Sequence, residues 1–283
     1  MNKITFPLKS LELNNKQFKI VNDNNINSKK IILSCAGSGK TLLIITRISF
    51  MIYKLGCNSE NFFLATFNRN AAEEMKQRLC QLIGINDVNC GTFHHLGIKL
   101  LKKYDYISSY DDEYHVDESQ IIFLNFLKSD RSKSLKQKIK YIFIDEFQDI
   151  NETQLQIIIE LSKFCDCLFL VGDDLQNIYS FRGSNNDIIL NIKTYFDDLT
   201  LEKMTTNYRS TPEIINLANQ IQNQNKNNFH KLMKSTKPNN TKPIIKIFDN
   251  LSKEIKFITE SIKNDLKNGF TKKQIAILSR NNM

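Results

Sequence analysis

The sequence has 283 residues, of which 41% are hydrophobic, and its formal net charge is +9. A chain of this length and apolar content can bury the core of one large or two moderate domains, which excludes a wholly disordered protein. It has no run of roughly 18 apolar residues that could cross a bilayer and no apolar stretch typical of a secretory signal, so we expect an intracellular protein (cytoplasm, nucleus or nucleoid) without a membrane partner.

The first strong pattern is IILSCAGSGKT at residues 31–41, where a β-branched run enters a small loop and an apolar helical pattern follows. This order is typical of a phosphate-binding P-loop, whose backbone N–H groups and helix start surround an anion. Ser34 stands where the strict pattern has glycine, which weakens a match on the loop alone. Lys40 would reach the β and γ phosphates and Thr41 would help hold Mg²⁺, so we predict a site for Mg-ATP. Its loop residues are Ala36, Gly37, Ser38, Gly39, Lys40 and Thr41.

Residues 11–22, ahead of this loop, begin with an amphipathic segment that contains Gln17. Alone, Gln17 would be an ordinary surface glutamine. Its distance from the P-loop makes it a candidate for reading adenine, because a side-chain amide both donates and accepts hydrogen bonds.

Buried strands and amphipathic helices alternate through the next part of the chain. Residues 100–140 are less regular, with one helix at 120–128 and a basic run at 131–140. His94 and His95 lie at a helix start, where adjacent side chains diverge by about 100°, so we favour nucleic-acid contact or capping over zinc. The six cysteines form no C-x-x-C pair, which also argues against zinc. The expected strands are 61–67, 88–92, 140–144 and 167–171, and the expected helices are 70–83 and 153–164.

The strand at 140–144 stops at Asp145 and Glu146, and the next strand leads to a loop that contains Gln176. Alternating strands and helices predict an α/β fold with a parallel sheet and helices on both faces, and ligands bind beyond the carboxyl ends of such strands. Asp145 would hold Mg²⁺ and Glu146 would polarise the attacking water.

The C-terminal part predicts a second, smaller α/β unit. Thr211, Pro212 and Glu213 open a helix, and a strand at 243–248, a helix at 252–266 and a strand at 274–279 follow. Between residues 231 and 280 there are twelve Lys or Arg residues and four acids, an excess that favours a polyanionic partner or a solvated lysine surface.

Together these motifs resemble the UvrD/Rep/PcrA group of superfamily 1 helicases. The similar stretches cover residues 11–212, and AILSRNN at 276–282 resembles a later segment of the family. DEFQD together with GDDLQNIYSFRG is the most specific part. In chain order, the similar motifs are NNKQ, AGSGKT, ATFNRNAAEEM, GTFH, IDEFQD, VGDDLQNIYSFRG and NYRS.

The resemblance implies a RecA-like P-loop domain and roles for further residues. Arg47 and Tyr208 would stack on the two faces of adenine, which Gln17 would read. Gln176 looks like the γ-phosphate sensor, and Arg209 like an arginine finger that stabilises charge in the transition state. The path of a single strand would be lined by Phe67, Asn68, His94, Tyr179, Phe181 and Arg182, whose aromatic rings would stack on bases.

The expected domains are a motor domain at residues 1–200, with a reduced insert at about 100–140, and a partial second RecA-like domain at 201–283. The family's last two motifs have no counterpart here. The resemblance implies an ATP-dependent 3'-5' DNA helicase that translocates on single-stranded DNA, completed by a second chain if its second domain is partial. An ATP- and single-strand-binding module that unwinds nothing is the alternative. The sequence does not separate DNA from RNA, because stacking and phosphate contacts serve both.

Overall fold

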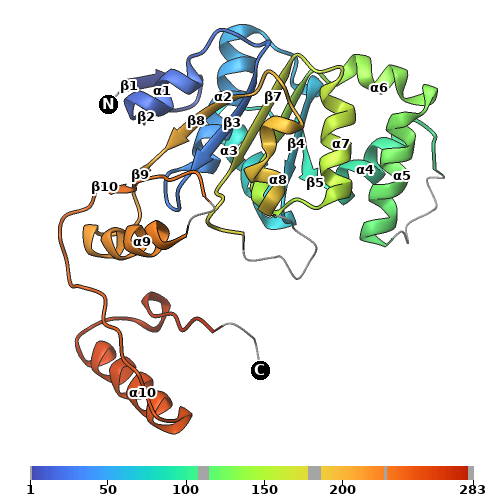
Figure 1. Cartoon of the computed structure of the whole chain (residues 1–283). Helices are drawn as coiled ribbons and strands as arrows, with labels where there is room; N and C mark the ends of the chain where they lie inside the picture. Colours follow the sequence, from blue (N-terminus) through green and yellow to red (C-terminus); the bar gives the residue numbers. More distant parts are fainter. Residues whose placement is uncertain (1, 108–114, 178–185, 226–227, 280–283) are drawn as a thin grey trace. The chain divides into compact units, whose positions relative to one another are not determined.

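The computed structural model describes residues 2–107, 115–177, 186–225 and 228–279 (Figure 1). The chain divides into two compact units, residues 1–241 and 242–283. The first unit contains a parallel sheet of six strands in the order β5-β4-β6-β7-β3-β8. The strands are β3 (Lys29–Ser34), β4 (Phe62–Thr66), β5 (Asn89–Thr92), β6 (Tyr141–Ile144), β7 (Cys167–Gly172) and β8 (Thr200–Met204).

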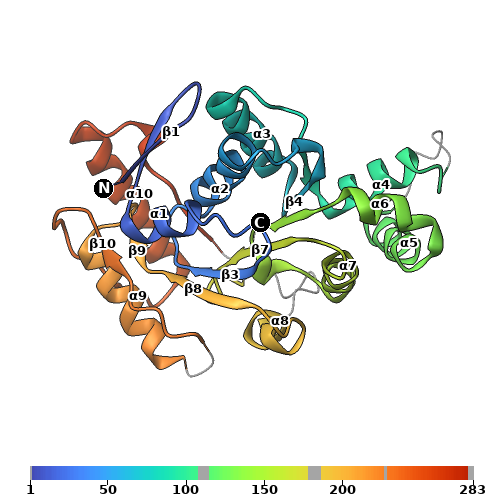
Figure 2. The same cartoon turned by 90° about the horizontal axis from the view of Figure 1, so that it is seen from above.

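Helices cover both faces of this sheet, as the sequence predicts (Figure 2). Successive side chains of a strand point to opposite faces, so Ile31 and Leu33 join one apolar cluster and Ile32 joins the other. One face carries α1 (Asn15–Val21), α2 (Lys40–Leu55) and α3 (Arg69–Ile83). The other carries α4 (Phe93–Lys103), α5 (Val116–Lys128), α6 (Lys133–Lys138), α7 (Glu152–Ser162) and α8 (Asn186–Leu190).

β8 forms one edge of the six-stranded sheet, and the residues after it form a separate two-stranded sheet. β8 pairs in parallel with β3, so that Leu201 lies opposite Ile31. The chain then forms β9 (Thr206–Asn207), α9 (Pro212–Gln224) and β10 (Lys234–Ser235), with β10 parallel to β9. The predicted division of the chain into RecA-like domains at residue 200 stays a prediction.

An antiparallel hairpin near the N-terminus was not expected from the sequence. It consists of β1 (Asn2–Thr5) and β2 (Ser10–Leu13), and its residues Ile4 and Leu13 are buried in the cluster that contains α2. The hairpin therefore extends the apolar layer on that face.

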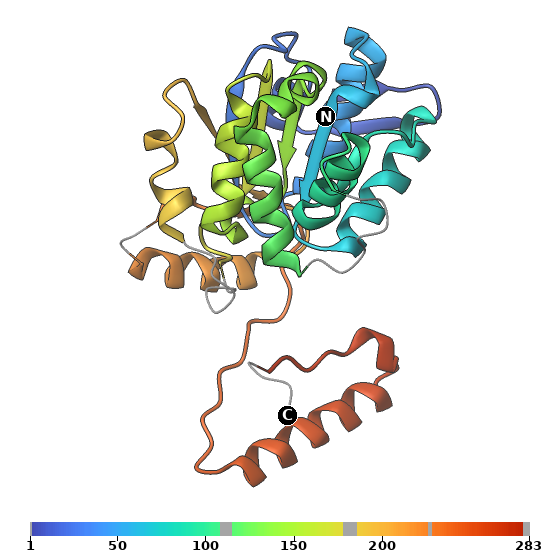
Figure 3. The same ribbon diagram turned by 90° about the vertical axis from the view of Figure 1, so that its right-hand side faces the viewer.

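The second unit contains α10 (Leu251–Lys267), the long red helix in Figure 3. The strands predicted at 243–248 and 274–279 are wrong: the described residues of this unit form no strand. A strand needs a partner for its N–H and C=O groups, and within residues 242–279 neither segment pairs with another strand. Ile245 and Ile247 are accordingly 76% and 94% exposed.

Candidate nucleotide site and nucleic-acid cleft

The P-loop joins the carboxyl end of β3 to the start of α2. Gly37 and Gly39 have φ values of 65° and 85°, in the left-handed region that suits glycine. Ser38 between them is buried, and its Oγ has no hydrogen-bond partner in the described structure. A buried polar atom without a partner is costly, and a phosphate oxygen in the loop would supply one. Ala36 and the half-buried Thr41 flank this turn.

Two acidic residues follow β6 and face the P-loop lysine. The Nζ of Lys40 lies 2.9 Å from a carboxylate oxygen of Glu146. Asp145 is 6% exposed, and burial together with the charge of Glu146 raises the pKa of its carboxyl to about 7. A divalent cation between such carboxylates would offset this cost, since hard cations prefer oxygen ligands. The residues therefore fit Mg²⁺ bound with phosphates, with Asp145 and Thr41 as candidate ligands.

Gln148 organises the acidic loop, a role that the sequence interpretation missed although DEFQD contains it. Its Nε2 donates to Glu146 at 2.9 Å and to Asp149 at 3.1 Å, and its Oε1 accepts from the N–H of Asp173 at 2.8 Å. Burial and the charge of Glu146 raise the pKa of Asp149 to about 6. One buried amide thus links the ends of β6 and β7.

Gln176 lies in the loop after β7, which sits between β6 and β3 in the sheet. Its Nε2 donates to Oδ2 of Asp173 at 2.5 Å, and its N–H donates to the carbonyl of Asp173 at 2.9 Å. The predicted phosphate sensor is therefore held by Asp173, on a loop at the same sheet edge as the P-loop.

The NYRS segment packs directly against the P-loop. The N–H of Tyr208 donates to the carbonyl of Gly37 at 2.9 Å, and Nδ2 of Asn207 donates to the carbonyl of Ala36 at 2.6 Å. A Cβ added at Gly37 would lie 2.7 Å from Cβ of Arg209. The structure thus brings the predicted finger residue beside the loop, with its side chain exposed. Asn207, buried and central to this contact, was not among the predicted site residues.

The predicted base-binding residues have different surroundings. Gln17 is 3% exposed; its Nε2 donates to the carbonyl of Ser38 at 3.1 Å and its Oε1 accepts from the N–H of Asn14. The side chain of Asn14 also donates to the hydroxyl of Tyr208. Gln17 and Tyr208 therefore lie beside the P-loop, but the amide of Gln17 already bonds within the protein.

The prediction that Arg47 stacks on adenine is wrong for this structure. Arg47 is 2% exposed, and its guanidinium donates to the backbone carbonyls of Val21, Asp23 and Asn25. Burial lowers its pKa. With the side chain enclosed, no face of the guanidinium is open to a base, and Arg47 instead holds the turn after α1.

A cleft of about 600 Å³ lies next to the acidic residues, at the ends of β4, β5 and β6. The half-buried Phe67 lines it, and Asn68 caps α3 by accepting from the N–H of Ala71. Nδ1 of His94 lies 2.6 Å from Oγ of Ser119, and burial followed by the charge of Arg69 lowers the pKa of His94. The predicted residues Phe67, Asn68 and His94 therefore share one cleft, while Tyr179, Phe181 and Arg182 lie outside the described residues.

This geometry defines a P-loop nucleotide-binding α/β domain: a glycine turn after β3, acids after β6 and polar loops at the same edge of a parallel sheet. The family model for the UvrD/REP helicase N-terminal domain matches residues 13–121 and 116–197, and the model for the UvrD-like helicase C-terminal domain matches 203–283. The chain therefore belongs to the UvrD/REP helicase family.

Individual relatives agree with this assignment. YjcD of Bacillus subtilis is 27% identical, over 96% of this chain and 46% of its own length. The ATP-dependent DNA helicase Rep of Buchnera aphidicola is 27% identical over 91% and 52%, and R568 of Acanthamoeba polyphaga mimivirus is 31% identical over 72% and 29%. The chain thus spans about half the length, or less, of these relatives. Among the described residues, no helix has both the length and the apolar character to cross a membrane.

Proposed function

We propose that this chain binds Mg-ATP and acts in ATP-driven translocation on single-stranded DNA, as a 3'-5' DNA helicase of the UvrD/Rep type inside the cell. The observation that carries this proposal is the meeting of four separate segments at one sheet edge: the P-loop, the acidic loop after β6, the Gln176 loop after β7 and the NYRS segment after β8. The direction of movement and the preference for DNA rest on the family resemblance.

The ion pair between Lys40 and Glu146 suggests how nucleotide binding activates the site. The two side chains are 11% and 33% exposed and lie 2.9 Å apart, so each neutralises the other. When Lys40 contacts phosphate oxygens instead, Glu146 is freed to take a proton from the attacking water. Bound Mg²⁺, held by Asp145 and Thr41, would neutralise phosphate charge. Gln176 and Arg209 would contact the terminal phosphate as it transfers.

The cleft beside this site is our candidate path for nucleic acid. Phe67 offers a ring at its wall, and stacking of a base on such a ring is worth about 1 to 3 kcal/mol. His94 offers a neutral, polar edge because its pKa is lowered. Asp145, Glu146 and Asp149 line the same cleft, so bases rather than phosphates would face them. RNA could use the same contacts, and the experiment below therefore includes it.

A binding module that hydrolyses ATP slowly and unwinds nothing is the second candidate. It is favoured by the described part of residues 242–283, which forms a helix but no strand. A motor of this class needs two domains that close on ATP, and a second domain without a sheet would need another chain or further residues to complete it.

ATP hydrolysis with and without single-stranded DNA or RNA, and displacement of a 3'-tailed strand, test both candidates. Lys40→Ala should abolish hydrolysis, whereas Lys54→Ala, at the exposed end of the same helix, should not. Stimulation by DNA with strand displacement supports the motor. ATP binding without either effect supports the module, and absence of ATP binding refutes both.

A further inference from the structure

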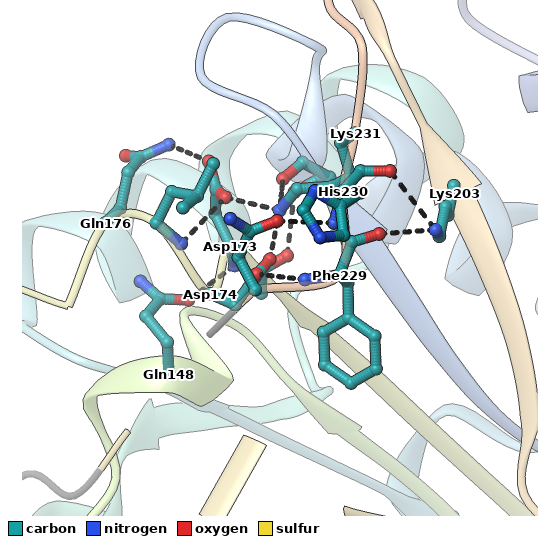
Figure 4. Close-up of polar contacts among 12 residues, drawn as sticks. Gln148, Asp173, Asp174, Gln176, Lys203, Phe229, His230 and Lys231 are labelled. Carbon is teal, nitrogen blue, oxygen red and sulfur yellow. Dashed lines mark hydrogen bonds and ion pairs between the residues drawn. The ribbon is translucent and has the colours of Figure 1, made fainter. Parts of the chain in front are cut away.

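Lys231 is buried at a position where the surrounding sequence predicts an exposed lysine. It lies within residues 214–242, a segment rich in Asn, Gln and Lys, yet its side chain is completely buried. Its Nζ donates to Oδ1 of Asp173 at 2.5 Å, to Oδ1 of Asp174 and to the carbonyl of Ser34 at 3.1 Å (Figure 4). An ammonium group has three N–H donors, so all three are used.

The turn that delivers Lys231 is itself anchored. The N–H of Phe229 donates to Oδ2 of Asp174 at 2.9 Å, and Nζ of Lys203 in β8 donates to the carbonyls of Phe229 and His230. His230 has a φ of 40°, in the left-handed region. This backbone turn places Lys231 against residues at the sheet edge (Figure 4). Lys231 belongs to the part of the chain that matches the C-terminal family model, whereas Ser34, Asp173 and Asp174 belong to the part that matches the N-terminal model.

The contacts connect Lys231 to the Gln176 loop. Asp173 uses Oδ1 for Lys231 and Oδ2 for Gln176, so one carboxylate lies between the lysine and the predicted phosphate sensor. On the other side, Ser34 is the last residue of β3, and its hydroxyl donates to the carbonyl of Gly172 at 3.1 Å. Lys231 therefore touches both the strand that enters the P-loop and the loop that carries Gln176.

Charge gives the lysine a specific task. Asp173 and Asp174 are 3% and 4% exposed, and their neighbouring carboxylates would repel each other without a buried cation between them. Within the described part of the chain, Lys231 forms an ion pair with both of them. Oδ1 of Asp173 also accepts from the N–H of Leu175 at 3.2 Å, so losing Lys231 would remove the charged one of two partners of this oxygen and loosen the carboxylate that holds Gln176.

We propose that Lys231 is a positioning residue for ATP hydrolysis, which fixes Gln176 through Asp173 and thereby makes the phosphate sensor depend on the segment after β8. This inference rests on the proposed function. It adds to it a buried contact through which movement of residues 228–236 would alter the sensor loop.

The test uses Lys231→Met combined with Asp174→Asn, because this pair of changes keeps the formal charge of the cluster at the wild-type value of minus one. Lys231→Met alone would leave two buried carboxylates without a cation and could fail to fold. Lys237→Met, at an exposed position nearby, is the matched control. All variants are first checked for a cooperative thermal transition.

Amide hydrogen exchange of residues 173–177 gives the first readout, independent of activity. Exchange should accelerate in the double variant and stay at the wild-type rate in Lys237→Met. Asp174→Asn alone, which keeps Lys231 and Asp173, should accelerate it less. Unchanged exchange in a folded double variant would overturn the proposal.

Kinetics give the second readout. In the wild type, Gln176→Ala should lower kcat about tenfold or more with little change in KM. In the double-variant background the same change should lower kcat less than about threefold, because Lys231 and Gln176 act through the same carboxylate of Asp173. Effects that simply multiply would indicate a purely structural lysine and refute the inference. A wild type that hydrolyses no ATP would refute the proposed function, and the exchange rates would still decide whether Lys231 holds the loop.

Discussion

Replacing Gly37 with alanine tests the contact between the P-loop and the NYRS segment. Gly37 has a φ of 65°, and its added Cβ would lie 2.7 Å from Cβ of Arg209 and 3.0 Å from Nδ2 of Asn207. Asn207 cannot easily move, because it is buried and donates to the carbonyl of Ala36. The two segments must therefore separate.

Gly56 offers a matched control. It ends α2 with a φ of 70°, and a Cβ there would meet nothing within 4 Å. Gly56→Ala should lower the free energy of unfolding by about 1 to 2 kcal/mol, the cost of a left-handed alanine. Gly37→Ala carries the same cost and adds steric overlap of about 1 to 3 kcal/mol and weakened hydrogen bonds of about 1 kcal/mol each.

The assay is urea unfolding of both variants and the wild type with linear extrapolation. We expect Gly37→Ala to be less stable than Gly56→Ala by about 2 to 4 kcal/mol and to lose ATP hydrolysis, while Gly56→Ala keeps it. Equal destabilisation by the two changes would show that Asn207 and Arg209 do not press on the P-loop, and would refute the reasoning.

Three further predictions concern buried polar groups of the first unit. In EDTA, the free energy of unfolding of the wild type should fall relative to that of Asp145→Asn as pH rises from 3.8 to about 7. The pKa of Asp145 is higher in the folded state than in the unfolded state, so folding favours the protonated carboxyl and loses this contribution as the pH rises. Urea titrations at each pH measure the difference, and parallel plots of stability against pH for the two proteins would contradict it. Gln148→Ala should cost about 1 to 3 kcal/mol, since it leaves the N–H of Asp173 without its acceptor; an unchanged urea midpoint would show the link is dispensable. Arg47→Met should lower the melting temperature, because it removes the donors to the backbone carbonyls at and after the end of α1. The Kd of the folded variant for a fluorescent ATP analogue should not change, and a higher Kd would support the base-stacking role.

The sequence was sufficient for the parts of the site that follow from strand ends. The buried apolar runs that end just before the P-loop and just before Asp145 can be placed with their carboxyl ends at one edge, because all strands of a parallel sheet end there. Arg47 could also have been recognised as buried, since it sits among Ile44, Ile45 and Ile48 in the helical pattern. The base-stacking role of Arg47 rests on the family resemblance alone.

Other features depend on contacts that no local pattern records. Lys231 looks like a solvated lysine, and it is buried only because a turn places it between two aspartates far earlier in the chain. Asn207 is buried by the P-loop itself. The predicted strand at 243–248 has suitable residues, but a strand requires a neighbour, and the pattern does not supply one.

The pairing of β8 with β3 has a practical consequence for dividing this protein. The two family models meet between residues 197 and 203, yet a fragment that stopped at residue 199 would uncover the hydrogen-bonding edge of β3, the strand that carries the P-loop. Such open edges promote aggregation. The same fragment would lack the ammonium group of Lys231, which pairs with both Asp173 and Asp174. A division after residue 241, where the first compact unit ends, keeps both contacts.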